Sequence, residues 1–350
     1  MDTLARGTGH LGIEVDVLAM SRNPSPPTTY MGGYRLHRSH LDLEVASTGM
    51  SLAVISRFAE FARSADLVHY HFPWPFMDLV HFLTRVKKPS VVTYHTDIVR
   101  QKGLLRLYRP LMNRFLKDVT HIVATSPNYL ETSDVLVDFK SKTSVIPIGL
   151  DQNAYPTAAA LRCAEWRQRY GPKFFLFIGV LRYYKGLHIL LQAAQGTELT
   201  VVIVGAGPIE NELKDQAALL GLSNVHFLGQ VSEDDKAALL VACYAIVFPS
   251  HLRSEAFGVS LLEGAMYGKP MISSEIGTGT TFVNIAGETG LVVPPSDPMA
   301  LQQAMHRLLE SPEEVAAMGR RAEERYWKLF TADKMVKSYV DLYKALCINP

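Results

Sequence analysis

Two carboxylates stand eight residues apart, Glu255 and Glu263, in the stretch SHLRSEAFGVSLLEGAMYGKP. At about 100° per helical residue this spacing places them roughly 80° apart around a helix, near enough to bind one elongated ligand. Gly258 lies between them and lets a ligand approach the backbone, and the free N–H groups of a helix's first turn attract an anion. A carboxylate, an anion-binding turn and a second carboxylate match the outline of a sugar, a diphosphate and a ribose.

The elements around the two acids are readable from the sequence. The run ACYAIVFPS, which ends at Ser250, predicts a buried strand, and Val259 to Tyr267 has the apolar spacing of a helix that a Gly and a Pro then end. This order places Glu255 on the loop at the strand's carboxyl end and Glu263 inside the helix. The plainer alternative is that Glu255 caps the helix and Glu263 is a solvated helix residue.

The whole stretch resembles the E-x7-E signature of retaining glycosyltransferases of family 4. The residues around the two acids match as well, namely Phe257, Gly258, Gly268, Lys269 and Pro270. The resemblance spans about residues 4–346 and implies an α/β protein of the GT-B fold, with two Rossmann-like domains facing a central cleft. It also implies transfer of a hexose from a nucleoside diphosphate sugar to an acceptor hydroxyl, with no cofactor and no metal.

The resemblance assigns roles within this motif. Glu255 would contact sugar hydroxyls, the amides of Phe257 and Gly258 would bind phosphate, and Glu263 would hold the ribose. The segments HYHFPWPF and LRYYKG are similar to the corresponding segments of bacterial mannosyl- and rhamnosyl-type transferases of surface polysaccharide and lipopolysaccharide synthesis. We therefore expect a donor like GDP-mannose and a glycan or lipid-linked glycan acceptor.

A second motif, FIGVLRYYKG, supplies cations at a predicted strand end. Arg182 and Lys185 offer the guanidinium and ammonium that a diphosphate leaving group needs, because negative charge builds on it as the sugar–oxygen bond breaks. The alternative is a pair of solvated surface charges. The family's turn reads G-R-L, a short gap and K-G, so Lys185 matches directly, whereas Val180 occupies the usual Arg position and Arg182 follows two places later.

Glycine turns predict the nucleotide pocket. VGAGP, with Gly205 and Gly207, follows a predicted strand but lacks the third Gly of a dinucleotide fingerprint. In the resembling family its backbone lines the nucleotide pocket, and the turn near Gly229 and Val231 covers the base.

Histidines mark the first half of the chain. A lone His near a strand end is more often structural, and His69 and His71 are read in that way. His95 matches the family's His that touches the donor sugar and the reacting centre, and Asp97 beside it is a weaker candidate. The neighbouring aromatic cluster is either core or part of an acceptor cleft: Phe72, Trp74 and Phe76.

Composition bounds the remaining possibilities. A chain of 350 residues is long enough for two domains, and 48% hydrophobic with 20% charged residues is typical of a soluble globular protein. A net charge of +1 does not indicate binding to nucleic acid. Three Cys far apart, Cys163, Cys243 and Cys347, favour a reducing cytoplasm and suggest no metal site. No apolar run reaches the length of about 18 residues that spans a bilayer.

Alternating apolar and helical segments predict two domains. Residues 1–153 form an acceptor-side Rossmann-like domain, completed by the C-terminal helix 331–350, and residues 154–330 form the nucleotide-sugar domain. The strands are expected at 13–19, 34–40, 67–70, 91–95, 122–125, 144–151, 173–181, 199–207, 225–231, 245–250 and 289–295. Because the chain opens on a helix tail, we expect that one strand–loop unit of the first sheet is missing and that this sheet has unpaired backbone groups.

The segment Val99 to Lys117 carries six basic residues and no acidic ones among apolar side chains. Such a segment binds anionic membranes, and the alternative is a surface helix with snorkelling side chains. Pro110 is expected to interrupt the helix. Peripheral contact would place this otherwise cytoplasmic protein at the inner face of the membrane.

Three other functions compete with transfer. A nucleotide-sugar epimerase needs an acid and base pair across the cleft, and no convincing pair is found. A nicotinamide-linked dehydrogenase is disfavoured by the broken glycine motif. A truncated, non-catalytic relic that still binds nucleotide sugar is the most serious rival, and turnover of labelled donor would separate it from an enzyme.

Overall fold

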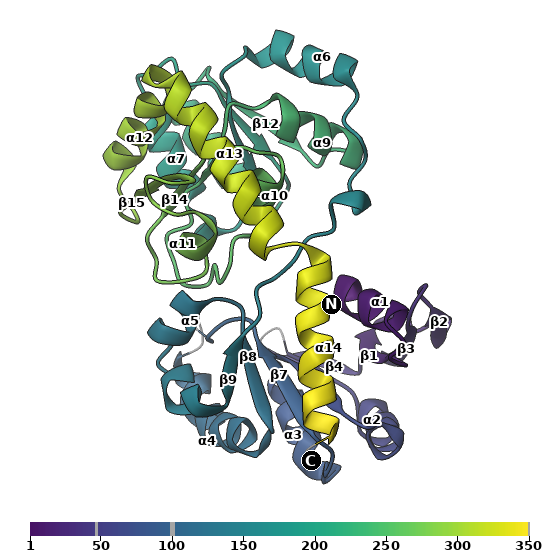
Figure 1. The fold of residues 1–350 in the computed structure, drawn as a ribbon. Coiled ribbons are helices and arrows are strands. Elements are labelled where there is room, and N and C mark those ends of the chain that lie inside the picture. The colour runs from purple at the N-terminus through teal and green to yellow at the C-terminus, as the bar shows by residue number, and fades with distance from the viewer. Residues whose placement is uncertain (46–47, 99–101, 349–350) are drawn as a thin grey trace. The chain divides into compact units, whose positions relative to one another are not determined.

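The computed structural model describes residues 1–45, 48–98 and 102–348, and these divide into two compact units. Unit 1 comprises Met1–Gly149 and Ala332–Pro350, and unit 2 comprises Leu150–Thr331 (Figure 1). The sequence-based boundary at 153/154 lies a few residues further along the chain. Each unit is an α/β structure of the Rossmann type, with parallel strands joined through helices.

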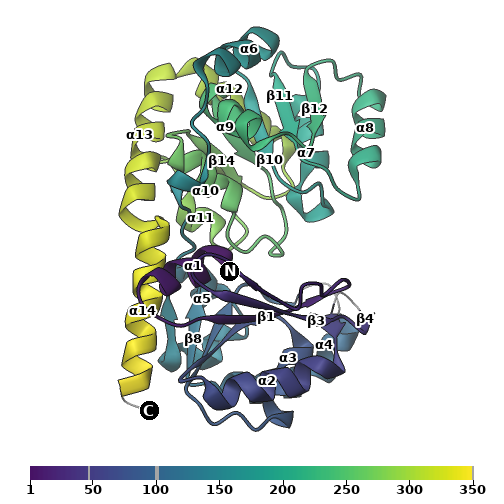
Figure 2. The same cartoon turned by 90° about the vertical axis from the view of Figure 1, so that its right-hand side faces the viewer.

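Unit 2 is built on a six-stranded parallel sheet (Figure 2). Its strands are β10 Phe175–Ile178, β11 Val201–Val204, β12 Val225–Gly229, β13 Ala245–Phe248, β14 Met271–Ser274 and β15 Gly290–Val293. Their spatial order is β12-β11-β10-β13-β14-β15. All four residues of β10, of β11 and of β13 are buried, because helices cover both faces of a parallel sheet. β10 and β13 are neighbours, which brings the loops that follow them together.

The helices of unit 2 connect these strands. They are α6 Ala160–Tyr170, α7 Leu187–Ala194, α8 Glu210–Leu219, α9 Glu233–Ala242, α10 Val259–Met266, α11 Thr280–Val283, α12 Pro298–Glu310 and α13 Pro312–Leu329. Several begin with the caps that the sequence provides: the side chain of Ser232 accepts the N–H of Asp235 at α9, and that of Asp297 accepts the N–H of Ala300 at α12.

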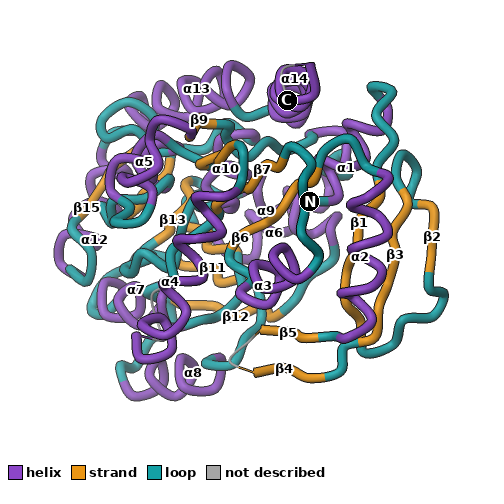
Figure 3. Tube along the Cα trace, turned by 90° about the horizontal axis from the view of Figure 1, so that it is seen from below, coloured by secondary structure: helices purple, strands orange, loops and turns teal. Residues whose placement is uncertain are grey.

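Unit 1 holds two larger, separate sheets, one parallel and one mixed, in which β2 pairs antiparallel with β3 (Figure 3). One contains β6 Val68–Phe72, β7 Ser90–Tyr94, β8 His121–Ala124 and β9 Thr143–Val145 in that order, and the other contains β1 Asp16–Ser21, β3 Arg35–His40 and β2 Thr28–Tyr30. Among the described strands β1 pairs only with β3 and β6 only with β7, so each has one open edge. A small hairpin, β4 Leu43–Val45 and β5 Thr48–Met50, stands apart from both sheets.

Helices complete unit 1, and the last one returns from the end of unit 2 to pack on it. They are α1 Asp2–His10, α2 Leu52–Ser64, α3 Pro75–Leu83, α4 Lys102–Asp118, α5 Pro127–Thr132 and α14 Ala332–Ile348. α14 packs against α1, which crosses it (Figure 1). Leu4, Val91 and Val336 share one core cluster, so the C-terminal helix is part of this unit's interior.

The prediction that Pro110 interrupts its helix is wrong. α4 runs unbroken from Lys102 to Asp118 with Pro110 inside it. Proline removes one backbone hydrogen bond, but Pro110 is exposed, and three buried side chains in the following turns, Met112, Phe115 and Leu116, hold the helix against the core. Residues 99–101 of the predicted basic segment lie outside the described residues. Nowhere in the described chain does a helix combine the length and apolarity needed to cross a bilayer.

Candidate functional site

The loop between β13 and α10 carries Glu255, whose side chain is buried. Its carboxylate forms a short ion pair with the ammonium of Lys185, and its Oε1 accepts the backbone N–H of Gly258 at 3.1 Å. Gly258 is the helix N-cap residue at φ 88°, a backbone conformation that favours glycine. Glu255 therefore caps the helix, as the plainer sequence alternative holds, and at the same time fixes a cation.

Lys185 ends a short 3₁₀ turn, Tyr183–Lys185, that follows β10. Its ammonium lies 4.6 Å from the centre of the Phe248 ring, so a cation–π contact supports the ion pair. Gly186 follows at φ 72°, and a Cβ there would lie 2.0 Å from the carbonyl oxygen of Pro249. The close packing of the two loops thus requires glycine and brings Lys185 to Glu255.

The three predicted glycines lie together at the carboxyl ends of neighbouring strands. The N–H of Gly205 donates to the carbonyl of Gly229 at 2.7 Å, and a Cβ on Gly207 would lie 2.3 Å from the carbonyl oxygen of Leu181. The strand ends of an open α/β sheet are where such folds bind ligands. Val231 follows this turn and is partly exposed.

Glu263 is buried inside α10, with 6% of its surface exposed. Tyr155 donates its hydroxyl to Glu263 Oε1 at 2.8 Å, and the ammonium of Lys236 lies 3.2 Å from the same oxygen. Burial raises the pKa of the Tyr155 hydroxyl, and the neighbouring Glu263 charge raises it further. Glu263 is thus a partnered buried acid rather than a solvated helix residue, and its ribose role stays a prediction.

Arg182 behaves differently from Lys185. It precedes the 3₁₀ turn, its side chain is exposed, and within the described residues its guanidinium has no hydrogen bond or ion pair. The structure therefore brings Lys185 to Glu255 and leaves Arg182 at the surface.

Sequence reasoning missed the partner loop of the Glu255 segment. Arg253 Nη1 donates to the carbonyl of Gly277 at 2.8 Å, and the N–H of Gly279 donates to the carbonyl of Ala256 at 2.8 Å. A Cβ on Gly279 would lie 2.7 Å from the Phe257 ring, whose side chain is buried. The small-residue run GTGTT, which follows β14, was the available signal for this contact.

In unit 1, His95 directly follows β7. Its Nε2 lies 2.9 Å from Nδ1 of His71, and the two rings are nearly parallel, at 11° to each other, with centres 5.2 Å apart. Burial lowers the pKa of His95 to about 4, so the ring is neutral near pH 7. His71, interpreted from the sequence as structural, is therefore a direct partner of His95, the histidine predicted to be catalytic.

Asp97 and the aromatic cluster have structural roles. Asp97 Oδ1 accepts the hydroxyls of Tyr94 at 2.8 Å and Ser133 at 2.7 Å, which fixes the loop after His95. In the cluster, Phe72 and Phe76 are buried in the core, and the indole N–H of Trp74 donates to the Gly49 carbonyl at 3.0 Å. For the two phenylalanines, the core alternative holds.

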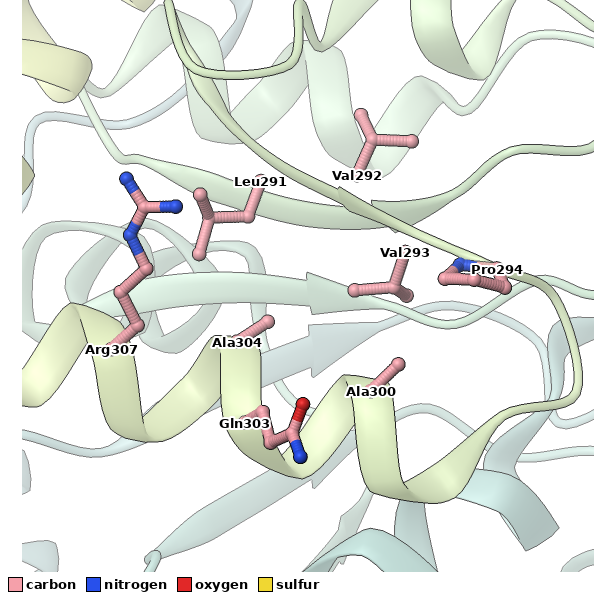
Figure 4. Close-up of a pocket in the computed structure, with 8 residues that line it drawn as sticks. All are labelled: Leu291, Val292, Val293, Pro294, Ala300, Gln303, Ala304 and Arg307. Carbon is pink, nitrogen blue, oxygen red and sulfur yellow. The ribbon is translucent and has the colours of Figure 1, made fainter.

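A hollow of about 280 Å³ lies between β15 and α12 (Figure 4). None of the predicted site residues lines it; its lining is Leu291, Val292, Val293, Pro294, Ala300, Gln303, Ala304 and Arg307. Within the described residues, no group of three or more His, Cys, Asp or Glu side chains could hold a metal ion.

Comparison with known proteins decides the family. Residues 1–154 match the family described as Glycosyltransferase Family 4, and residues 164–325 match that described as Glycosyl transferases group 1. D-rhamnosyltransferase WbpZ of Pseudomonas aeruginosa is 64% identical over 94% of this chain and 86% of its own length. The chain belongs to the family 4 glycosyltransferases. This family 4 chain is also 46% identical to O-antigen chain mannosyltransferase C of Escherichia coli, over 98% of this chain and 92% of that protein.

Solved structures agree on the fold. Sucrose-phosphate synthase from Thermosynechococcus elongatus superimposes with a TM-score of 0.80 at 23% identity, covering 99% of this chain and 92% of that chain. The expected GT-B class is thereby confirmed. The expected enzyme class is confirmed by the named transferases among the relatives, which also disfavour the relic and epimerase alternatives.

Proposed function

We propose that this family 4 glycosyltransferase moves a mannose-type hexose, mannose or its 6-deoxy form rhamnose, from a GDP-linked donor to a glycan or lipid-linked glycan of a bacterial surface polysaccharide. The two relatives named above support this proposal, because they are a rhamnosyl- and a mannosyltransferase with 64% and 46% identity over nearly the whole chain. The transfer is of the retaining type, as in the family that the E-x7-E motif resembles.

The observation that carries the chemistry is the buried Lys185–Glu255 pair beside the first turn of α10. Lys185 has three N–H donors and uses one on Glu255, so two remain for the oxygens of a departing diphosphate. Glu255 keeps carboxylate lone pairs for sugar hydroxyls. The N–H of Gly258 is already bonded to Glu255, so the donors for phosphate are the backbone N–H groups of the first turn of α10 that follows it. In this proposal the chain's own cation stabilises the leaving group, with no cofactor or metal.

Glu263 supplies the ribose contact in this scheme. Tyr155 and Lys236 both bond to its Oε1, and within the described residues no hydrogen bond uses Oε2. The partners hold the carboxylate in one orientation, and the second oxygen is left to accept ribose hydroxyls.

Donor identity is tested by calorimetric titration with GDP, UDP, GDP-mannose and UDP-glucose, followed by transfer assays with the donor that binds. We expect GDP compounds to bind more tightly than UDP compounds and Lys185→Met to abolish transfer. Tighter binding of UDP-glucose than of GDP-mannose would overturn the donor assignment.

We also propose that α4 contacts anionic membranes, as an enzyme with a lipid-linked acceptor would need. Leu104 and Leu107 are 53% and 81% exposed, and the exposed Arg106 and Arg109 lie about 100–160° around the helix from the two leucines. Exposed leucines flanked by arginines suit an interfacial helix.

The test is co-sedimentation with vesicles containing an anionic lipid. Leu104→Ser combined with Leu107→Ser should abolish binding. Leu219→Ser is the matched control, because Leu219 is 87% exposed on α8 in unit 2. Equal sedimentation of all three proteins would contradict membrane contact through α4.

A further inference from the structure

Three imidazoles lie in a row in unit 1. His69 and His71 sit two residues apart on β6 and point to the same side of that strand, with ring centres 4.6 Å apart. His71 in turn meets the edge of His95, which follows the neighbouring strand β7. The family pattern marks only His95, so the row is a feature of the fold that the motif does not reveal.

His69 is fully engaged at both ring nitrogens. Its Nδ1 lies 2.7 Å from the hydroxyl of Tyr343, and its Nε2 lies 2.7 Å from Thr93 Oγ1. Thr93 Oγ1 is 2.7 Å from the hydroxyl of Tyr339, so two tyrosines of α14 fix this end of the row. His69 therefore contacts His71 only through its ring face.

His71 and His95 share one hydrogen bond between ring nitrogens, Nδ1 of His71 and Nε2 of His95, at 2.9 Å. A neutral imidazole has one N–H and one acceptor nitrogen, so one ring must donate and the other accept. Protonating the acceptor would set two N–H groups against each other. Burial lowers the pKa of both rings, which keeps the pair neutral.

This pairing determines what His95 offers to a ligand. Since its Nε2 is committed to His71, its Nδ1 is the nitrogen left for substrate. The phosphate oxygens of the proposed donor only accept hydrogen bonds, whereas its hydroxyls both donate and accept, so an Nδ1–H is the form of His95 that can bond to either group. That tautomer requires His71 to be the donor of the shared hydrogen bond.

We propose that His71 is a positioning residue: its Nδ1–H donates to Nε2 of His95 and so holds His95 as the Nδ1–H tautomer. The inference rests on the proposed function only in taking a sugar nucleotide as the ligand of His95 Nδ1; the tautomer itself does not depend on that function. The free imidazole favours the Nε2–H form, so the predicted tautomer differs from what an unconstrained histidine would show.

The primary measurement is the tautomer of His95 in the full chain, read from ¹⁵N–¹H correlations of the histidine rings and assigned with a His95→Gln variant. We expect the Nδ1–H form in the wild type. A wild-type His95 in the Nε2–H form would overturn the proposal, whatever any variant does.

Two substitutions separate positioning from packing. His71→Phe keeps an aromatic ring at this position and removes the hydrogen bond, and should return His95 to the Nε2–H form and lower kcat by about ten-fold with little change in KM. His71→Asn places an N–H near the lost Nδ1–H and should retain the tautomer and most of kcat. Tyr70→Phe is the control, because it removes a 2.8 Å buried hydrogen bond to His81 from the same strand and should leave His95 unchanged.

The outcomes distinguish the two hypotheses. If His95→Gln keeps full transfer while the wild-type tautomer is as expected, the catalytic role of His95 fails and the positioning by His71 stands. If His71→Phe leaves the His95 tautomer unchanged, the positioning fails even where activity falls.

Discussion

Neutralising Glu255 should destabilise unit 2, and neutralising Lys185 as well should restore it. The two side chains are 10% and 12% exposed, so their pairing takes place largely out of water. Glu255→Gln keeps the shape of the side chain and an oxygen that can accept the N–H of Gly258, and it removes the charge that faces Lys185. The substitution therefore isolates the ion pair from the helix cap.

The magnitude follows from burial. Leaving one charge of a buried pair without its partner costs about 3–5 kcal/mol. The Phe248 ring, 4.6 Å from the ammonium, offsets about 0.5–2 kcal/mol of this cost. We expect Glu255→Gln to lower the free energy of unfolding by about 2–3 kcal/mol. The double variant with Lys185→Met removes both charges and should lie within about 1 kcal/mol of the wild type.

Urea unfolding followed by circular dichroism measures the four stabilities, and a transfer assay measures activity. All three variants should be inactive, since each lacks a group proposed to act on the donor. The exposed pair Arg307–Glu314 is the control, and Glu314→Gln should change stability by under about 1 kcal/mol. Additive losses in the double variant would refute the reasoning, because uncoupled side chains do not compensate for each other.

Three further predictions concern single sites. Glu263→Gln should weaken donor binding by about 1.5–3 kcal/mol in calorimetry, because a charged acceptor is lost, and an unchanged affinity would count against the ribose role. Burial lowers the pKa of His69 to about 3 and that of His95 to about 4, so below pH 6.5 these two rings bind more protons in the unfolded chain than in the folded one. Their contribution to stability should be full above pH 6.5 and be lost as the pH drops toward 4, and a denaturation series of the Asp78→Asn variant that is flat from pH 7 to 4.5 would contradict this. Burial raises the pKa of Asp78 to about 8, so between pH 4 and 8 this side chain is protonated in the folded chain and ionised in the unfolded one, and the stability of the wild type falls as the pH rises through this range. Asp78→Asn should therefore be more stable than the wild type at pH 8, with a smaller gain at pH 5. A gain that does not depend on pH would point to another cause.

Five of the six strands of unit 2 could be predicted because they are apolar runs, whereas β14, Met271–Ser274, is not among the predicted strands. FLFI, VVIV and AIVF became β10, β11 and β13, each shorter at its carboxyl end than expected. The predicted strand at 144–151 is reduced to β9, Thr143–Val145, since Pro147 cannot donate to a ladder. The apolar pattern locates a strand, whereas the residue at which the strand ends depends on where its backbone stops pairing with the neighbouring strand and turns into a loop.

The partners of the predicted acids could not be predicted from spacing. Lys185 and Glu255 are 70 residues apart, and Tyr155 and Glu263 are 108 apart. Sequence periodicity reports neighbours within one helix or strand. Contacts over such separations depend on strand order, which these motifs do not encode.

Strand order also explains why one cation of the motif is used and the other is not. β10 lies directly beside β13, so the turn after β10 meets the loop after β13. The turn is fixed there at two points, by Gly186 against the carbonyl of Pro249 and by the N–H of His251 donating to the carbonyl of Tyr184 at 3.0 Å. Lys185 lies between these two points and reaches Glu255. Arg182 lies before them and is exposed, so its position relative to the end of the neighbouring strand, more than its charge, keeps it from Glu255.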